Sequence, residues 1–131
     1  MTHTDIPELE RIASEIVDAA VKVHSALGPG LLESAYQTCL SHEMMRRGHK
    51  VSTEVLLPLT YEDLTVENAY RVDMLIDDQV IVENKVTQNL LPIHRAQVFT
   101  YLKLTRMRLG LLINWNTRLV KHGIKRVVYN K

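Results

Sequence analysis

The stretch YRVDMLIDDQVIVENKV, residues 70–86, constrains the fold more than any other part of the sequence. Two apolar runs rich in Val, Ile and Leu flank the polar break DDQ, which predicts two antiparallel strands joined by a turn. Charged residues interrupt both runs: Asp73 in the first, and Glu83 and Lys85 in the second. Since side chains alternate between the two faces of a strand, Glu83 and Lys85 share a face. The fold must therefore accommodate these charges in a sheet that is otherwise apolar.

The length of the turn decides whether the two acids meet. If DDQ forms a three-residue loop, Ile76 lies opposite Val80, and the same register places Asp73 opposite Glu83. Directly opposed residues have Cβ atoms about 4.5–5.5 Å apart, so the carboxylates would repel unless a positive charge lies between them. Lys85 is one candidate for that charge, and a divalent cation is another. A two-residue loop would break this pairing, because one residue of slip moves a side chain to the other face. Strand charges of this kind also occur on solvated sheet faces with weak ion pairs.

Helical patterns lie on both sides of this hairpin. Residues 8–26 repeat apolar residues at spacings of three and four, which predicts an amphipathic helix, and a second helix is expected over residues 31–47. Two or three antiparallel strands are expected within residues 50–87, and Pro58 suggests a bulge or an edge position there. A third helix is expected after Pro92, followed by two short strands, RLGLLINW and IKRVVYN.

This pattern indicates an α/β fold with a central mixed sheet of four to five strands, helices on both of its faces, and the order α-α-β-β-β-α-β-β. The apolar positions of the helices are the expected core. They are Leu9, Ile12, Ile16, Ala20, Val23 and Leu27 in the first helix, Leu32, Tyr36, Leu40 and Met44 in the second, and Ile93, Ala96, Val98 or Phe99, and Leu102 in the third.

The stretch LGPGLLESAYQ separates the first two helices. Gly28 and Gly30 flank Pro29, so one helix ends and the next begins at a fixed place. Glu33 and Tyr36 follow Gly30 at steps of three, and each such step moves about 60° around a helix axis. We therefore expect Glu33 at the flank of the apolar stripe, where the helix meets the sheet, and not in solvent. A carboxylate there is costly unless it has a partner.

Charge is divided unevenly along the chain. All 15 Asp and Glu lie in residues 1–83 together with 6 of the 16 Lys and Arg, and residues 84–131 carry the other 10 and no acid. A basic half favours a polyanion such as nucleic acid as the partner. The alternative is that the two halves pair with each other in the fold.

Size and composition exclude several other classes. The 131 residues, 46% of them hydrophobic, suit a single globular domain over residues 1–131. No window approaches the roughly 18 uninterrupted apolar residues of a membrane span, and the polar N-terminus MTHTDIPELE is not a secretory signal. The single cysteine, Cys39, cannot form an internal disulfide, and its place on the apolar stripe predicts a core thiol. A cytoplasmic location is the expectation.

These residues carry a resemblance. Asp73 followed by Glu83-Asn84-Lys85 resembles the signature of the PD-(D/E)XK nuclease superfamily. More closely, the blocks VHSALGPGLLESAY, YRVDMLI, VIVENKV, HRAQVFTYLK and LGLLIN, in this order over about residues 12–128, look like the bacterial GxxExxY family within it. Asn84 is a departure, since that family more often has an apolar residue there, and its side chain is expected to point away from the site.

The resemblance implies a restriction-endonuclease-like core and a metal-dependent nuclease. Asp73 and Glu83 would hold Mg²⁺ or Mn²⁺, which prefer oxygen ligands. The backbone carbonyl of Asn84 would add an oxygen, and Glu33 would complete the acidic shell or bind a second metal. Lys85 would orient or deprotonate the attacking water and stabilise charge on the phosphate.

The resemblance also implies roles outside the acidic shell. Gln97 and Tyr101, one helical turn apart, match the family's downstream helix motif and would position the lysine, a phosphate or the water; surface polarity is the alternative. His24 has two interpretations: a metal ligand, as in some relatives, or a helix-end histidine bonded to a nearby carbonyl. Arg95, Lys103, Arg106 and Arg108 are the expected phosphate contacts. The remaining histidines considered, His42, His49, His94 and His122, have no spacing that suggests a site.

Two other functions fit the same residues. A catalytically silent nuclease-fold module would bind nucleic acid or a protein partner without turnover. A small structural subunit would use the charge asymmetry for contacts between copies, for example in a homodimer.

Overall fold

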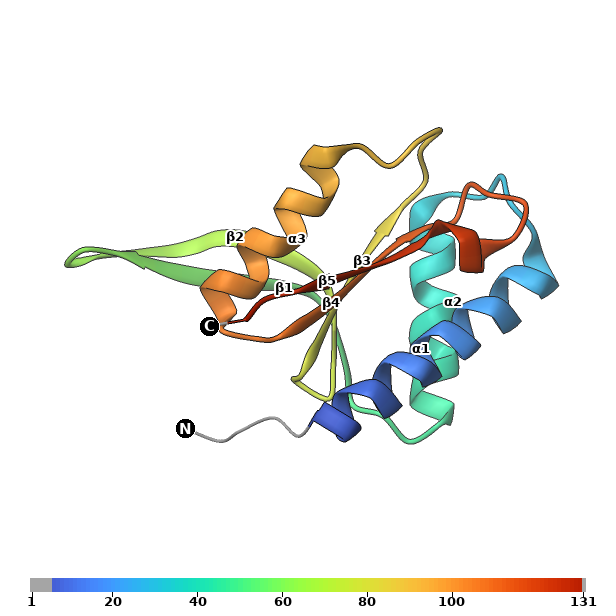
Figure 1. Cartoon of the computed structure of the whole chain (residues 1–131), viewed down its shortest axis with the longest axis horizontal. Coiled ribbons are helices and arrows are strands. Elements are labelled where there is room, and N and C mark those ends of the chain that lie inside the picture. Colours follow the sequence, from blue (N-terminus) through green and yellow to red (C-terminus); the bar gives the residue numbers. More distant parts are fainter. Residues whose placement is uncertain (1–5, 131) are drawn as a thin grey trace.

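The order of helices and strands follows the predicted one. The computed structural model describes residues 6–130 (Figure 1). Its elements are α1 (Ile6–Leu27), α2 (Glu33–Arg46), β1 (Val51–Tyr61), β2 (Leu64–Ile76), β3 (Val80–Lys85), α3 (Pro92–Thr105), β4 (Leu109–Asn114), the 3-10 helix η1 (Val120–Gly123) and β5 (Ile124–Val128).

The strands form one mixed sheet in the order β1-β2-β3-β4-β5. Only β3 and β4 run parallel, and α3 makes the crossover between them. The other neighbours are antiparallel. Ile76 pairs with Val80, so DDQ is the three-residue loop that places Asp73 and Glu83 in register. The sheet also confirms Pro58 as an edge and bulge residue, because β1 is an outer strand and its register with β2 shifts between Leu57 and Leu59.

Helices cover both faces of the sheet, as predicted. Figure 1 shows α1 and α2 on one side and α3 on the other. The residues of α1 and α2 form one apolar cluster with Met74, Ile76 and Val82, and those of α3 form a second cluster with Ile81 and Leu112. The two layers of the core are thus the two faces of the same strands.

The predicted core is correct for most of α1 and α2 and wrong at the ends. Leu9, Ile12, Ile16, Ala20, Val23, Tyr36, Leu40 and Met44 are buried. Leu27 and Leu32 are exposed, Leu32 by 77%, because they flank the GPG connection beyond the sheet. Cys39 is half-buried and packs against the core.

Helix α3 buries a narrower face than expected. Val98 and Leu102 are buried, whereas Ile93 is 68% exposed and Ala96 and Phe99 are also exposed. The helix lies very close to β4, since a Cβ added to Gly110 would come within 2.6 Å of Val98 Cγ1. Such close contact brings one stripe of the helix against the sheet and leaves its flanks outside.

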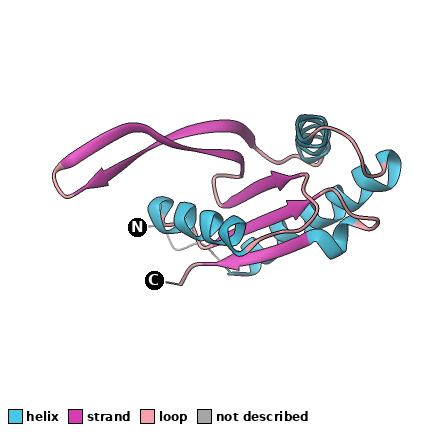
Figure 2. Ribbon diagram, turned by 90° about the horizontal axis from the view of Figure 1, so that it is seen from above, coloured by secondary structure: helices cyan, strands magenta, loops and turns pink. Residues whose placement is uncertain are grey.

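The β1–β2 hairpin extends well beyond the rest of the protein (Figure 2). Its outer part is exposed and includes Leu56, Tyr61 and Leu64. No helix in residues 6–130 has the length and apolar character that a membrane crossing requires.

Candidate functional site

Strands β2 and β3 part at the two predicted acids. The ladder between them ends at the pair Met74–Val82. Beyond that pair, β2 continues beside β1, while β3 continues beside β4 as far as Lys85. Asp73 and Glu83 are the first residues past the end of the ladder, so their side chains lie in the fork between the strands.

The two carboxylates bind backbone groups across this fork. Glu83 Oε2 accepts a hydrogen bond from the backbone N–H of Asp73 at 2.7 Å. Asp73 Oδ2 accepts one from the backbone N–H of Asn84 at 2.8 Å. Asp73 is 7% exposed and Glu83 is 3% exposed. Each acid therefore satisfies a main-chain donor that has left the ladder, and each keeps a second carboxylate oxygen for another partner.

Burial and mutual repulsion disfavour the ionised form of this pair. Burial raises the pKa of Glu83 to about 8, and the charge of Asp73 contributes in the same direction. Burial also raises the pKa of Asp73, although the hydrogen bond from Asn84 opposes the shift. Without a bound cation, Glu83 keeps its proton up to about pH 8, and a nearby positive charge would favour its release.

Lys85 supplies one such charge from the same strand. It is half-buried, and its Nζ donates a hydrogen bond to Gln97 Oε1 of α3 at 3.2 Å. Its charge lowers the pKa of Asp73 and of Glu83. Lys85 and Gln97 are thus brought together as expected, beside the acidic pair.

Tyr101 lies one helical turn beyond Gln97 on the same side of α3. Its ring stacks on Tyr70 of β2 with centroids 5.0 Å apart. Burial raises the pKa of Tyr101, and the charge of Glu83 raises it further. This aromatic pair joins α3 to β2, and Tyr101 lies within electrostatic range of Glu83.

The expectation that Glu33 is sheltered from solvent is wrong. It is the first residue of α2 and is exposed, because the helix begins two residues later than predicted and leaves Glu33 at its end. Within residues 6–130 its carboxylate has no hydrogen bond or ion pair. Partial burial and then the charge of Asp73 raise the pKa of Glu33, while Lys85 lowers it. Glu33 therefore lies at the rim of the site, within electrostatic range of the pair.

Glu54 is a fourth acid near the site that the sequence did not reveal. It lies on β1 between two paired positions, Thr53 opposite Met74 and Val55 opposite Val72, and so comes beside Asp73 without pairing with it. Its charge raises the pKa of Asp73. In the sequence, Glu54 is only a glutamate within an otherwise apolar strand. That position alone does not give the register of β1 with β2.

His24 matches the second of its two interpretations. Its Nε2 lies 3.1 Å from the backbone oxygen of Trp115, and the ring is buried beside Trp115 and Tyr36. Since a carbonyl oxygen only accepts, Nε2 carries the proton and is occupied by this bond.

Tyr36 of the GPG stretch is a structural residue. Its hydroxyl donates to the Gly28 carbonyl at 2.5 Å and accepts from the Leu31 N–H at 3.1 Å. Its ring stacks on Trp115 with centroids 4.8 Å apart. Gly28 and Gly30 adopt positive φ, which glycine allows, so the tyrosine fixes a sharp connection just before Glu33.

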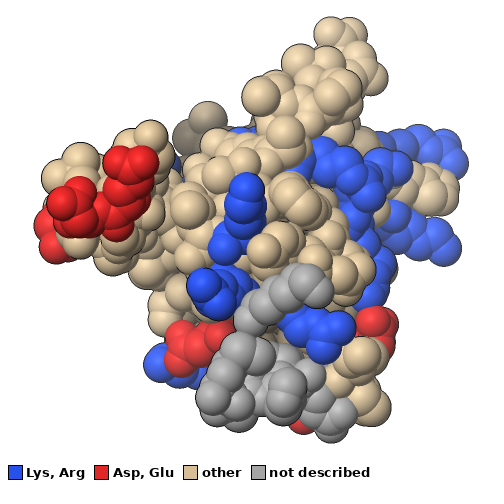
Figure 3. All heavy atoms as spheres, turned by 60° about the vertical axis from the view of Figure 1, so that its left-hand side comes forward, with Lys and Arg blue, Asp and Glu red and all other residues tan. Residues whose placement is uncertain are grey.

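Ion pairs between the acidic and basic halves are rare. Among the described residues, Arg126–Glu10 at 2.6 Å is the one ion pair that joins them. Figure 3 shows acidic side chains at the far end of the β1–β2 hairpin, Lys and Arg side chains over much of the rest of that face, and smaller acidic groups near its lower edge. Pairing of the halves within the fold therefore does not account for the basic half.

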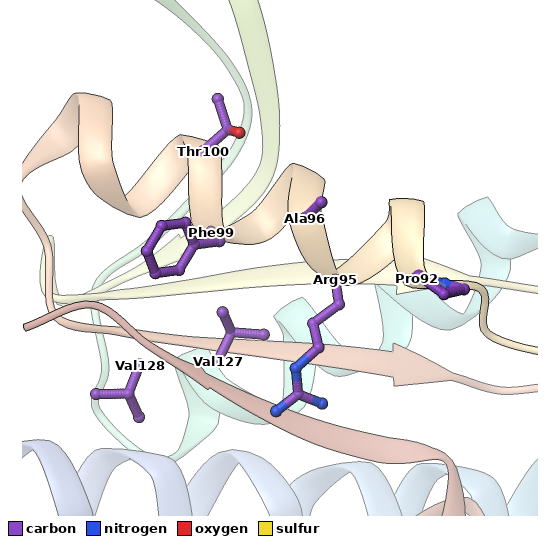
Figure 4. A pocket seen from close by; sticks show the side chains of 7 residues that line it. All are labelled: Pro92, Arg95, Ala96, Phe99, Thr100, Val127 and Val128. Atoms are coloured by element: carbon purple, nitrogen blue, oxygen red, sulfur yellow. The ribbon is translucent and has the colours of Figure 1, made fainter.

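The four expected phosphate contacts all lie away from the fork. Arg95 extends from α3 across a groove of about 480 Å³ toward β5 (Figure 4), where its Nη2 donates to the Arg126 carbonyl at 2.9 Å. At about 100° per residue, Arg95 lies about 160° and Lys103 about 120° around α3 from Gln97. Arg106 follows the C-terminus of α3, and Arg108 precedes β4, whose first residue pairs with Val80 at the opposite end of β3 from Lys85.

The acids present could hold a hard cation only with help from other oxygen atoms. Within residues 6–130, no three His, Cys, Asp or Glu side chains are close enough together to hold a metal ion on their own. Asp73 and Glu83 provide two carboxylates with free oxygens, and the main chain around Asn84 adds a carbonyl. Because Mg²⁺ usually keeps several waters, this donor set fits such a cation.

Comparisons with known proteins bear on the family and the fold. The family model for the PD-(D/E)XK nuclease superfamily matches residues 10–127. The fold is similar to that in the crystal structure of SSO0001, with a TM-score of 0.58 and 18% sequence identity; the match covers 95% of this chain and 61% of that one. No curated protein matches significantly.

Proposed function

Because the chain belongs to the PD-(D/E)XK nuclease superfamily, we propose that it hydrolyses phosphodiester bonds of DNA or RNA in a reaction that requires Mg²⁺ or Mn²⁺. Within the superfamily we assign it to the GxxExxY group, on Gly30, Glu33 and Tyr36. The observation that carries the proposal is the buried Asp73–Glu83 pair in the strand fork, with Lys85 beside it.

The acidic pair would hold the cation. Asp73 and Glu83 each have an oxygen free of the backbone bonds, and the Asn84 carbonyl would contribute a third ligand. A bound divalent cation lowers the pKa of water and polarises the phosphoryl oxygen. Glu33, at the rim, would bind a water of the cation's shell and not the ion itself.

The other residues would act on the water and the phosphate. Lys85, oriented by Gln97 Oε1, would donate to the water or to a phosphate oxygen and stabilise developing charge. Tyr101, on the same side of the fork as Gln97, would position the water or a phosphate oxygen through its hydroxyl. Arg95, Lys103, Arg106 and Arg108 would bind phosphates farther along the nucleic acid and not the scissile one, because they lie away from the fork.

The test is cleavage of plasmid DNA, single-stranded DNA and RNA by purified protein with Mg²⁺, Mn²⁺ or EDTA. We expect cation-dependent cleavage that Lys85→Ala removes and that Lys50→Ala, an exposed control lysine paired with Asp78, leaves unchanged. Activity that persists in the double variant Lys85→Ala/Asp73→Ala would sink the proposal.

A silent binding module is the second candidate. It is favoured by the lack, in the described part of the chain, of three side-chain donors around one point. It predicts salt-sensitive nucleic-acid binding by a protein that takes up no Mn²⁺ in calorimetry.

A further inference from the structure

A chain of hydrogen bonds crosses the molecule behind the acidic pair. Trp115 Nε1 donates to Asn84 Oδ1 at 2.9 Å. Asn84 Nδ2 donates to Gln37 Oε1 at 3.1 Å, and Gln37 Nε2 donates to Glu54 Oε2 at 2.8 Å. These hydrogen bonds link Trp115, just after β4, to the C-terminal end of β3, helix α2 and the edge strand β1.

The direction of every bond in this chain is fixed by its two ends. An indole N–H can only donate and a carboxylate can only accept. The Asn84 amide must therefore present its oxygen to Trp115 and its nitrogen to Gln37, and the Gln37 amide must follow the same sense. The Glu54 end is held from its other side by an ion pair with Arg71 at 3.0 Å.

The inner hydrogen bonds of this series join buried groups, so losing one of them costs free energy. Asn84 and Trp115 are fully buried, and a buried amide without partners is costly. The carboxamide of Asn84 also contacts Met74 Sδ at 3.3 Å, so both of its ends are occupied. An apolar residue at this position would fill the space but would offer no bond to α2.

Gln37 is the point where this chain meets the helix that carries Glu33. The two residues are four apart, so they lie on the same side of α2, one turn from each other. Glu33 has no hydrogen bond of its own among the described residues, and its place at the rim depends on where α2 lies. The bonds of Gln37 set the rotation and depth of that first turn against β3 and β1.

We propose that Gln37 and Asn84 are positioning residues that hold α2, and with it Glu33, against the Asp73–Glu83 pair. The role of Glu33 rests on the proposed function, whereas the anchoring of α2 does not. Gln37→Met removes both bonds at nearly constant volume. Loss of a hydrogen bond that positions the residues around a metal site typically costs about 10- to 100-fold in activity, and we expect a loss of this size in cleavage rate.

The first experiment is a double-variant cycle on cleavage rate, with Gln37→Met introduced into wild type and into Glu33→Gln. If Gln37 acts through Glu33, its substitution lowers the rate in wild type and changes little in Glu33→Gln. A purely structural role would lower both rates by the same factor, and that result overturns the proposal. So does a Glu33→Gln variant with full activity. Gln79→Met, in the β2–β3 turn, is the control.

The second experiment is amide hydrogen exchange without metal, which needs no activity. We expect Gln37→Met and Gln37→Glu to speed exchange in residues 37–41 and not in α1. The swap Gln37→Glu/Glu54→Gln restores an acceptor between two amide donors and should restore slow exchange. If exchange in residues 37–41 is unchanged in both single variants, the proposal that Gln37 holds α2 in place is wrong. If the wild-type protein neither cleaves nucleic acid nor binds Mn²⁺, the proposed function is wrong. The exchange measurement then still tests whether Gln37 holds α2 in place.

Discussion

Asp73 and Glu83 are joined by the main chain between them: the Glu83 carboxylate accepts from the Asp73 N–H, and the Asp73 carboxylate accepts from the N–H that follows Glu83. These bonds take the place of the ladder where β2 leaves β3. The opening of the sheet and the placement of the acids are therefore one feature, and replacing either acid by alanine leaves a buried donor unpaired.

Stability of the metal-free protein should depend on the protonation of Glu83. The carboxyl titrates near 4.5 when unperturbed and near 8 in the fold. Between these values the unfolded chain has released the proton that the folded protein keeps, so the free energy of unfolding falls as pH rises from 4.5 to 8. Urea unfolding in EDTA at pH 5 and pH 8 measures the fall.

Glu83→Gln keeps an acceptor for the Asp73 N–H and cannot ionise. We expect it to match wild type near pH 5, to exceed it at pH 8, and to reduce the slope between them. A slope unchanged by this substitution would contradict the assignment to Glu83.

Cation binding should release a proton in the same window. A cation held by Asp73 and Glu83 must displace the proton that Glu83 retains below pH 8. Affinity for Mn²⁺ should therefore tighten by up to about tenfold per pH unit from pH 6 to 8 and level off above. Calorimetry in two buffers of different ionisation enthalpy measures affinity and proton release together. An affinity that stays constant between pH 6 and 8 would argue against binding at this pair.

The approach of Asp73 to Glu83 could be anticipated from sequence because it is local. Once DDQ is a three-residue loop, strict alternation puts both acids on one face, and burial of Ile76 and Val82 on the other face holds that register. Lys85 follows from the same alternation. Helix order and the two-sided sheet also follow from local periodicity.

The position of Glu33 and the presence of Glu54 could not be predicted in the same way. Glu33 is exposed because α2 begins at that residue, and the start is set by the Tyr36 hydroxyl bonds to the preceding loop. Glu54 reaches Asp73 through the register of an edge strand that contains a bulge. Both depend on contacts between segments that the sequence pattern does not specify.

His49 should stabilise the fold most strongly at low pH. It is buried between Asp77, 2.6 Å from Nδ1, and Glu15, 2.8 Å from Nε2, so both ring nitrogens face acceptors. Burial acts to lower the pKa of His49, but the hydrogen bonds to both acids outweigh it and the pKa is raised. Its contribution is full below about 6.5 and is lost as pH rises through the folded value.

His49→Asn removes at least one of these charge-assisted bonds. We expect a loss of about 2–3 kcal/mol at pH 5.5, and less at pH 9, from urea unfolding. His42→Gln, an exposed histidine on α2, should change stability little at either pH. Equal losses at both pH values for His49→Asn would show that the ring acts by packing and not by charge.

Gly110 allows α3 to lie against β4, and through it sets the distance of Gln97 from Lys85. A Cβ at this position would meet Val98 Cγ1 at 2.6 Å and Leu102 Cδ1 at 3.7 Å. Gly110→Ala should therefore destabilise the protein by about 1–3 kcal/mol through overpacking. Val98→Ala removes the colliding methyl, so the double variant Gly110→Ala/Val98→Ala should recover most of the loss that Gly110→Ala causes. The Gly110→Ala change should also lower cleavage per folded molecule, and the double variant should recover part of it, because a shift of α3 moves Gln97 relative to Lys85. Thermal unfolding and cleavage of wild type, Gly110→Ala, Val98→Ala and the double variant measure both effects, and a double variant less stable than either single one would show that the contact is not the cause.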